Sequence, residues 1–162
     1  MTEMADDIPR TYEEVMKSED PLHWQAAIER ELESLKENEV YEVIQTGDID
    51  IINLVDAKWV FAKKSKDVFK ARLVIRGFKD ITPHGIEEIY SPVPKLETMR
   101  LMISVAVNNG YKIIHLDVVA AFQHSKINYN VFVRPAAGTE CTPNTLWRLK
   151  RSLYGLLTAA KD

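Results

Sequence analysis

Residues 58–78 read KWVFAKKSKDVFKARLVIRGF, and this stretch is the strongest indicator of the fold. Apolar residues alternate with Lys and Arg on both sides of the short polar segment 65–67. A period of two predicts strands at 58–64 and 68–78. A connection this short predicts that the two strands pair as a β-hairpin. The sequence therefore predicts an antiparallel hairpin rich in basic side chains.

The charge along the chain is unevenly distributed around this hairpin. Residues 58–79 hold eight Lys or Arg and a single acidic residue, Asp67, whereas residues 1–50 hold 4 basic and 15 acidic residues. An acidic leader before a basic block predicts that one face of the hairpin meets a polyanion. The alternative is that the hairpin is only a solvated, lysine-rich surface.

Two helices are predicted before the hairpin. Thr11 and Glu14 have capping-box spacing and open a turn or two of helix. A longer helix is predicted from Pro21, with Asp20 as its N-cap, to about Asn38. Its apolar residues recur at helical spacing and predict a core-facing stripe: Trp24, Ile28, Leu32 and Leu35.

Several shorter elements follow the same patterns. Period-two alternation predicts four further strands, at residues 40–44, 51–55, 130–134 and 146–149. A helix is predicted at about 98–109, with Gly110 placed to end it. Residues 112–118 form a nearly continuous apolar run, typical of a central strand buried on both faces. Ser152 is positioned to cap a last helix.

Asp117 is the most unusual position, because it lies within the apolar stretch IIHLDVVAAF at 113–122. A buried carboxylate needs hydrogen bonds, a cationic partner or a metal ion. Two interpretations stay open from the residues alone. Asp117 either caps the turn that follows a strand or serves as a metal ligand at the end of a central strand.

Composition excludes several classes of protein. Hydrophobic residues make up 46% and charged residues 28% of the 162 residues, which is typical of a globular chain. The lone Cys141 can make no internal disulfide and cannot alone build a zinc site. Apolar runs fall well short of the ~20 residues of a membrane span, and the acidic first ten residues contain no signal-peptide core. We expect an intracellular protein of cytoplasm or nucleus, neither secreted nor in a membrane.

The motifs, taken in order, resemble the reverse transcriptase domain of Ty1/copia-type LTR retrotransposons. KARLVIRGF at 70–78 resembles the family's KARLVAKGF, and YSPVPKLETMR at 90–100 resembles FSPVVKxxTIR. LDVVAAF at 116–122 matches LDVxxAF, and SLYGL at 152–156 matches the family's SLYGL. RPAAG at 134–138 lies where QPxGF is expected. The resemblance extends over about residues 24–160.

This resemblance implies an α+β fold, an incomplete right-hand polymerase of fingers and first part of the palm, with a helical N-terminal leader. The implied division is an acidic leader at 1–20 and a partial reverse transcriptase domain at 21–162. The implied function is that of the N-terminal portion of an RNA-directed DNA polymerase within a Pol polyprotein. The alternative is a non-catalytic nucleic-acid-binding or interaction module derived from a retroelement.

The resemblance also assigns roles to individual residues. It implies that Asp117 is the first of three catalytic aspartates and a Mg²⁺ ligand. Phe122 is implied to pack under the sugar of the incoming nucleotide and to exclude a 2′-hydroxyl. Lys70 and Arg72 are implied to meet either the triphosphate or the template backbone, an alternative left open.

The implied partners are an RNA or DNA template–primer, a deoxynucleoside triphosphate and the rest of the polyprotein. Further nucleic-acid contacts are expected from three basic residues of the hairpin region: Lys63, Lys64 and Arg76.

The sequence also departs from the family pattern. The family's other two aspartates form an Asp-Asp pair after SLYGL, whereas the only aspartate here after Asp117 is Asp162. One carboxylate cannot hold the two metal ions of a polymerase site. Leu157 and Thr158 replace a lysine and a glutamine, the latter expected near the nucleotide. The resemblance therefore implies a retroelement fragment that does not polymerise by itself.

Overall fold

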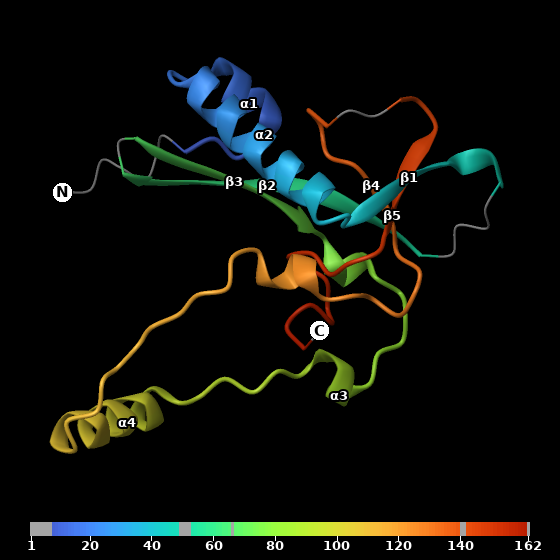
Figure 1. The fold of residues 1–162 in the computed structure, drawn as a ribbon. Helices are drawn as coiled ribbons and strands as arrows, with labels where there is room; N and C mark the ends of the chain where they lie inside the picture. Colours follow the sequence, from blue (N-terminus) through green and yellow to red (C-terminus); the bar gives the residue numbers. More distant parts are fainter. Residues whose placement is uncertain (1–7, 49–52, 66, 140–141, 162) are drawn as a thin grey trace.

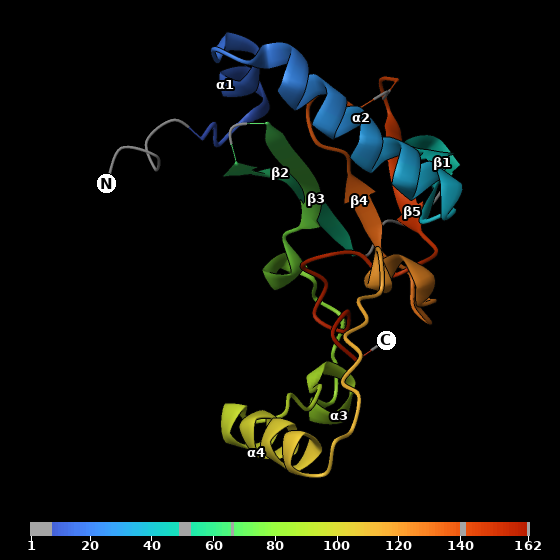
Figure 2. The same cartoon turned by 60° about the vertical axis from the view of Figure 1, so that its left-hand side comes forward.

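The computed structural model describes residues 8–48, 53–65, 67–139 and 142–161. A five-stranded sheet forms its centre, and helix α2 (Pro21–Glu37) crosses one face of it (Figures 1 and 2). Helix α1 (Tyr12–Lys17) packs beside α2. Below the sheet lie the short helix α3 (Ile86–Ile89) and, further out, helix α4 (Leu96–Asn108). The architecture is thus a mixed α and β fold, as the sequence predicted.

The sheet has the order β1-β5-β4-β2-β3. Its strands are β1 (Tyr41–Gln45), β2 (Leu54–Ser65), β3 (Val68–Ile75), β4 (Phe132–Arg134) and β5 (Thr145–Leu149). Strands β2 and β3 pair antiparallel with Trp59 opposite Leu73, which confirms the predicted hairpin. Strand β4 runs parallel to β2, and β5 pairs antiparallel with both β4 and β1.

Two strand boundaries differ from the prediction. The strands predicted at 51–55 and 58–64 form one strand, β2, in the described residues; positions 51–52 lie outside them. Strand β3 ends at Ile75, not at residue 78, because Gly77–Lys79 turn into a 3₁₀ helix, η2. The alternation of residues predicted the two paired strands of the hairpin correctly. It did not predict the residue at which β3 ends.

The core lies between α2 and the hairpin. The Trp24 ring of α2 meets Phe69 edge-on at 4.7 Å and Phe61 at 5.5 Å between ring centroids. Such edge-to-face pairs contribute beyond the area that they bury. Val15 of α1 is completely buried in the same core. Part of the acidic leader therefore packs as one unit with the rest of the chain.

The first helices begin where predicted, and the predicted cap of α1 by Thr11 is confirmed. The Thr11 hydroxyl accepts a hydrogen bond from the Glu14 amide at 3.2 Å, while the Glu14 carboxylate accepts from the Arg10 amide at 2.7 Å. Asp20 occupies the N-cap position of α2 as predicted, but its side chain makes no capping hydrogen bond. Its carboxylate instead pairs with Lys63 at 3.2 Å, an interaction between distant residues that local sequence cannot reveal.

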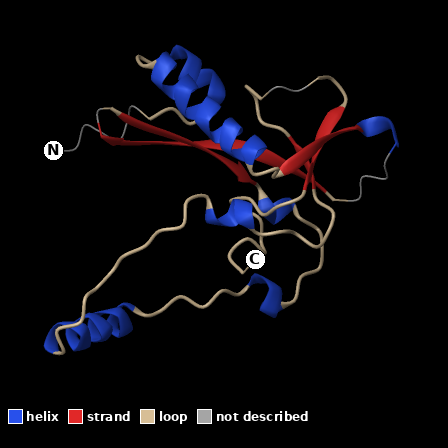
Figure 3. Cartoon of the chain, viewed as in Figure 1, coloured by secondary structure: helices blue, strands red, loops and turns tan. Residues whose placement is uncertain are grey.

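The predicted central strand at 112–118 is not formed. Residues 111–119 are exposed and run as an extended arm from α4 back toward the sheet, drawn as loop in Figure 3. A strand needs a neighbour to accept and donate its backbone hydrogen bonds. Among the described residues, none pairs with this arm as a strand, so its apolar pattern alone does not make it one.

Helix α4 is confirmed, beginning at Leu96, with Gly110 following it at φ +69°. None of its side chains is buried, and Figures 1 and 2 both place it away from the sheet. The predicted helix after Ser152 is wrong, since residues 152–161 form turns and irregular backbone. Gly155 at φ +90° interrupts any helical progression there. No helix in the described part of the chain is long and apolar enough to span a membrane.

Candidate nucleotide and nucleic-acid interface

The hairpin presents two different faces. Phe69, Ala71, Leu73 and Ile75 of β3 are buried, whereas Lys70 and Arg72 between them are exposed. Side chains alternate across a strand, so the exposed set points away from α2. Lys70 lies opposite Ala62 and Arg72 opposite Val60 of β2. We call the basic side turned away from α2 the open face; it comprises Lys58, Lys64, Lys70 and Arg72.

Three of these cations influence one another electrostatically. The Lys64 ammonium is the largest cause of a lowered pKa at Lys70, followed by partial desolvation and by Arg72. The carboxylate of Asp117 acts on Lys70 in the opposite direction. A local excess of positive charge is the condition that a bound anion relieves. The fold thus brings Lys64, Lys70, Arg72 and Asp117 into one electrostatic neighbourhood.

An aromatic stack connects the open face to the segment containing Phe122. The Arg72 guanidinium lies over the Tyr154 ring, 4.9 Å from its centroid. Phe122 meets the same ring at 4.8 Å with an interplanar angle of 82°. Tyr154 therefore contacts two side chains that the resemblance assigns to nucleotide binding. Residue-by-residue reasoning gave Tyr154 no role, although the SLYGL motif marked its position.

Backbone contacts hold Tyr154 in place. The Ile75 amide donates to the Tyr154 carbonyl at 2.7 Å. A Cβ on Gly77 or on Gly155 would collide with the facing backbone, with Gly155 O and Ile75 O respectively. The end of β3 and the Tyr154 turn therefore cross at a separation that only glycines permit.

The remaining basic residues are placed differently. Lys63 lies on the α2 side of the hairpin, with its Nζ 4.5 Å from the Phe69 ring centroid and paired with Asp20. It is thus on the opposite side from Lys64 and Lys70. Arg76 follows β3, is exposed, and donates its amide to the Asp56 carbonyl at 2.8 Å.

Asp117 lies on the exposed arm rather than in a buried strand. The described residues contain no group of three or more His, Cys, Asp or Glu side chains that could hold a metal ion. Magnesium sites are built from carboxylate and other oxygen ligands, and here one carboxylate faces a lysine-rich surface. The residues described do not fit a two-magnesium site.

A buried polar network joins the hairpin to the segments below it. The Asp80 carboxylate, whose side chain is 0% exposed, accepts from Asn53 Nδ2 at 2.7 Å and from the Thr82 amide at 2.9 Å. The second carboxylate oxygen lies 3.3 Å from His84 Nε2 and 3.3 Å from the Tyr129 hydroxyl. Burial would raise the pKa of Asp80, but the bonds from Thr82, Asn53 and His84 outweigh it and lower that pKa.

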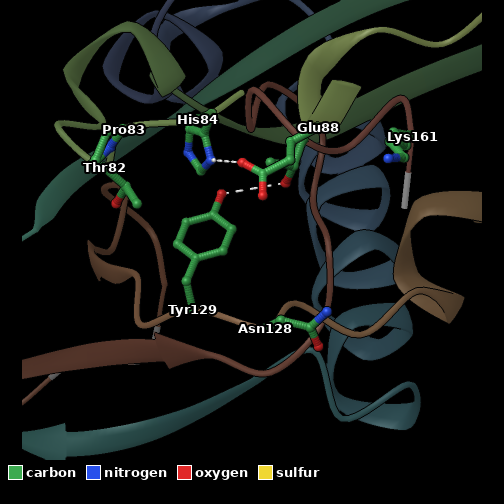
Figure 4. A pocket seen from close by; sticks show the side chains of 8 residues that line it. Thr82, Pro83, His84, Glu88, Asn128, Tyr129 and Lys161 are labelled. Carbon is green, nitrogen blue, oxygen red and sulfur yellow. Dashed lines mark hydrogen bonds and ion pairs between the residues drawn. The ribbon is translucent and has the colours of Figure 1, made fainter. Parts of the chain in front are cut away.

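A hollow of about 370 Å³ lies beside this network (Figure 4). His84 faces Glu88 across it at 3.6 Å, and the Tyr129 hydroxyl lies 3.3 Å from Thr158 Oγ1. Several polar groups at its wall thus have partners within the protein: Thr82, His84, Glu88, Tyr129 and Thr158. We interpret this network as a set of structural contacts that hold residues 80–88 against the C-terminal segment. Sequence patterns did not indicate this role.

Comparison with known proteins identifies the family of the chain. The chain belongs to the family described as reverse transcriptase (RNA-dependent DNA polymerase), whose model matches residues 38–161. Its relatives are copia-type retrotransposon Pol polyproteins, which confirms the resemblance found in the sequence. No solved structure matches the chain.

Two relatives illustrate the extent of the match. The chain is 30% identical over 161 residues to the "Retrovirus-related Pol polyprotein from transposon TNT 1-94" of Nicotiana tabacum, covering 95% of this chain and 12% of that relative. It is 29% identical over 164 residues to the corresponding polyprotein from transposon RE1 of Arabidopsis thaliana, covering 97% and 11%. The chain therefore corresponds to a small part of these polyproteins, within their reverse transcriptase region.

Proposed function

We propose that the chain forms the fingers and the first part of the palm of a right-hand RNA-directed DNA polymerase. In this proposal the open face and the Arg72–Tyr154–Phe122 stack form one wall of the site for the incoming deoxynucleoside triphosphate. The observation that carries the proposal is this stack, which joins a cation and two aromatic rings from three distant segments.

Each part of the wall has a distinct task. The Tyr154 ring supports the Arg72 guanidinium by a cation–π contact, and the N–H groups of Arg72 would bind phosphate oxygens. Lys64 and Lys70 add positive charge beside Arg72. Phe122 packs its ring against Tyr154, and in this proposal it would pack against the sugar and disfavour a 2′-hydroxyl by its size.

The catalytic role of Asp117 remains part of this proposal. In support of it, the Asp117 carboxylate acts on the pKa of Lys70 in the direction opposite to Lys64 and Arg72. In a polymerase site it would supply one of several oxygen ligands to Mg²⁺. The template–primer and the remainder of a Pol polyprotein are the expected partners.

A second candidate function is a non-catalytic nucleic-acid-binding module. The observation that favours it is the single carboxylate of Asp117 beside an otherwise basic surface, with no metal-binding cluster in the described residues. Such a module would bind nucleic-acid backbones through the open face and would show no preference for a nucleotide triphosphate.

Binding of a fluorescent deoxyadenosine triphosphate by the chain tests the proposal. We expect Arg72→Gln to weaken binding about tenfold or more, since a hydrogen bond to a charged group contributes about 1.5–3 kcal/mol. Tyr154→Ala should weaken it as well, because Arg72 loses its support. Phe122→Ala should reduce the preference for the deoxy over the ribo form. The matched control is Arg148→Gln, which removes another exposed arginine, paired with Glu42 on β1.

The outcomes separate the two candidates. If Arg72→Gln and Arg148→Gln bind the nucleotide equally well, the wall is not a nucleotide site. If, in addition, Arg72→Gln weakens binding of a 20-nucleotide single strand, the non-catalytic module is the correct interpretation. Circular dichroism of each variant verifies that the loss is not one of folding.

A further inference from the structure

Strand β1 presents an open edge at the end of the sheet opposite β3. No other strand in the described part of the chain pairs with this edge. In an antiparallel pair, alternate residues exchange hydrogen bonds with the neighbouring strand. The Thr46 amide donates to Asn144 and the Lys150 amide donates to Val40, so the even-numbered residues of β1 bond to β5. The N–H and C=O groups of Val43 therefore point outward from the sheet.

The two outer strands of the sheet are treated differently by α2. At the β3 edge, side chains of α2 bond to the Leu73 amide and the Phe69 carbonyl. At the β1 edge, no described side chain bonds to the backbone of Val43 in this way. Strand β1 also contains neither Pro nor Lys, which often block an exposed edge. This edge is therefore open to an added strand.

A hollow of about 250 Å³ lies beside β1 on the α2 face of the sheet. Its apolar lining consists of Leu32 from α2 and Tyr41, Val43 and Trp147 from the sheet. The Val43 side chain is 55% exposed there. A strand paired with β1 would place every second side chain on this face, next to Val43. Those side chains would lie in the hollow, which we call the β1 hollow.

The α2 side of the β1 hollow is acidic. Glu29 and Glu33 line it, and Glu37 continues the row at a spacing of four residues. All three are exposed, and none forms an ion pair with another described residue. Lys36 also lines the hollow but already has an interaction within the chain. Like charges four residues apart on a helix repel each other, and a cationic partner would relieve this repulsion.

The lining of the β1 hollow also contains a buried donor. Trp147 is 1% exposed, and its Nε1 has no hydrogen-bond partner among the described residues. The Tyr41 ring stacks on it with 3.7 Å between ring centroids. A buried donor without an acceptor lowers stability. A partner that brings carbonyl oxygens to this part of the sheet would therefore be favoured.

We propose that the β1 edge and the β1 hollow bind an extended basic peptide of another protein. Its backbone pairs with β1, an apolar side chain contacts Leu32 and Val43, and Lys or Arg residues two positions away meet Glu29 and Glu33. A second copy of this chain suits the edge less well, because antiparallel pairing of two β1 strands would bring two acidic rows together. The inference does not depend on the nucleotide wall, which includes β3 at the other end of the sheet.

The test is fluorescence anisotropy with the fluorescein-labelled peptide Thr-Lys-Thr-Leu-Thr-Lys-Thr, which carries Lys and Leu on one face when extended. Glu29→Lys/Glu33→Lys should weaken binding about tenfold, since two ion pairs become repulsive. The same variant should bind the analogue with Glu in place of Lys more tightly than the parent does, a gain that a folding defect cannot produce. The matched control is Glu87→Lys/Glu97→Lys, which changes the net charge equally at exposed positions of α3 and α4 and should bind as the parent does.

Strand pairing is tested by N-methylation of the peptide, which removes backbone donors and leaves every side chain in place. One peptide is methylated on its Thr amides and the other on its Lys and Leu amides. Because only one set of amides faces β1, one methylated peptide should lose binding and the other should keep it.

Equal binding by the two methylated peptides would overturn the proposal, and so would a Glu29→Lys/Glu33→Lys variant that binds like its control. A parent dimer that Val43→Lys converts to monomer, measured by light scattering, would also overturn it and would assign the edge to a second copy of the chain.

Discussion

At the scale of single residues, Glu31 shows how a helix can protect a strand edge. β3 is an outer strand of the sheet, and exposed edges promote association with other chains. The Glu31 carboxylate of α2 accepts from the Leu73 amide at 3.2 Å, and Arg30 donates to the Phe69 carbonyl at 3.4 Å. Two backbone groups of this edge are thus satisfied by side chains of α2.

Glu31 also makes the stability of the fold depend on pH. Burial raises the pKa of Glu31, although the bond from Leu73 and the nearby Arg72 oppose the shift. The folded state therefore binds a proton more readily than the unfolded state. Its contribution to stability is highest at pH values below 4.5, the ordinary pKa, and declines as the pH rises through the elevated value.

We predict that Glu31→Gln keeps the bond to Leu73 and removes this pH dependence. At pH 7 the variant should be at least as stable as the parent, because no charge is then buried. Glu31→Ala should lose about 1–3 kcal/mol, since the Leu73 amide is left without its acceptor. Urea unfolding followed by tryptophan fluorescence between pH 4 and 8 measures both. A Glu31→Gln protein with the parent's pH profile would show that Glu31 does not cause it.

At the scale of elements, the crossing of η2 with the Tyr154 turn determines whether the nucleotide wall can form. Gly77 packs against the carbonyl of Gly155, and the Ile75 amide bonds to Tyr154 at 2.7 Å. This contact joins the end of β3, which carries Arg72, to the turn that carries Tyr154. A shift here would separate the guanidinium from the ring.

We predict that Gly77→Ala lowers the free energy of unfolding by about 1–3 kcal/mol, because the new methyl group collides with backbone rather than with a flexible side chain. The control is Gly47→Ala, where a Cβ meets no atom within 4 Å. That change should alter stability by no more than about 0.5 kcal/mol. Equal melting curves for the two variants would mean that the crossing is loose.

At the scale of the whole molecule, the large apolar surface of α4 and the arm at 111–119 is the dominant feature. All side chains of α4 are at least partly exposed, and Met102 and Val107 are each 68% exposed. The arm adds further exposed side chains, including Leu116 and Val119 at 84%. Monomeric soluble proteins rarely expose contiguous apolar surface of this kind.

We predict that the chain associates with itself in solution through this surface. Replacing Met102 and Val107 with Lys should shift the distribution toward monomer and leave the melting temperature unchanged, because neither side chain supports the core. Light scattering after size-exclusion chromatography measures the mass. The control is Leu22→Lys, an equally exposed apolar position on α2 at 75%. A monodisperse parent monomer would refute the prediction.

The local pattern of residues was sufficient for the hairpin, for α1, α2 and α4, and for the positions of β1, β4 and β5. These elements are specified by periodicities within the segments themselves. The same sequence also carried the ordered motifs that place the chain in its family. It located Lys70, Arg72 and Phe122 as candidates, but it did not indicate that Tyr154 would contact both Arg72 and Phe122.

Tertiary structure decided the features that depend on partners distant along the chain. The apolar run at 112–118 is no strand, because a β-ladder requires a neighbour that a local pattern cannot provide. Lys63 faces α2 because strand alternation and the Asp20 pair place it there. The Asp80 network needs Asn53, His84 and Tyr129 from separate segments. Hydrogen bonds and ion pairs between such segments form only after the backbone has brought them together, so no periodicity in the sequence records them.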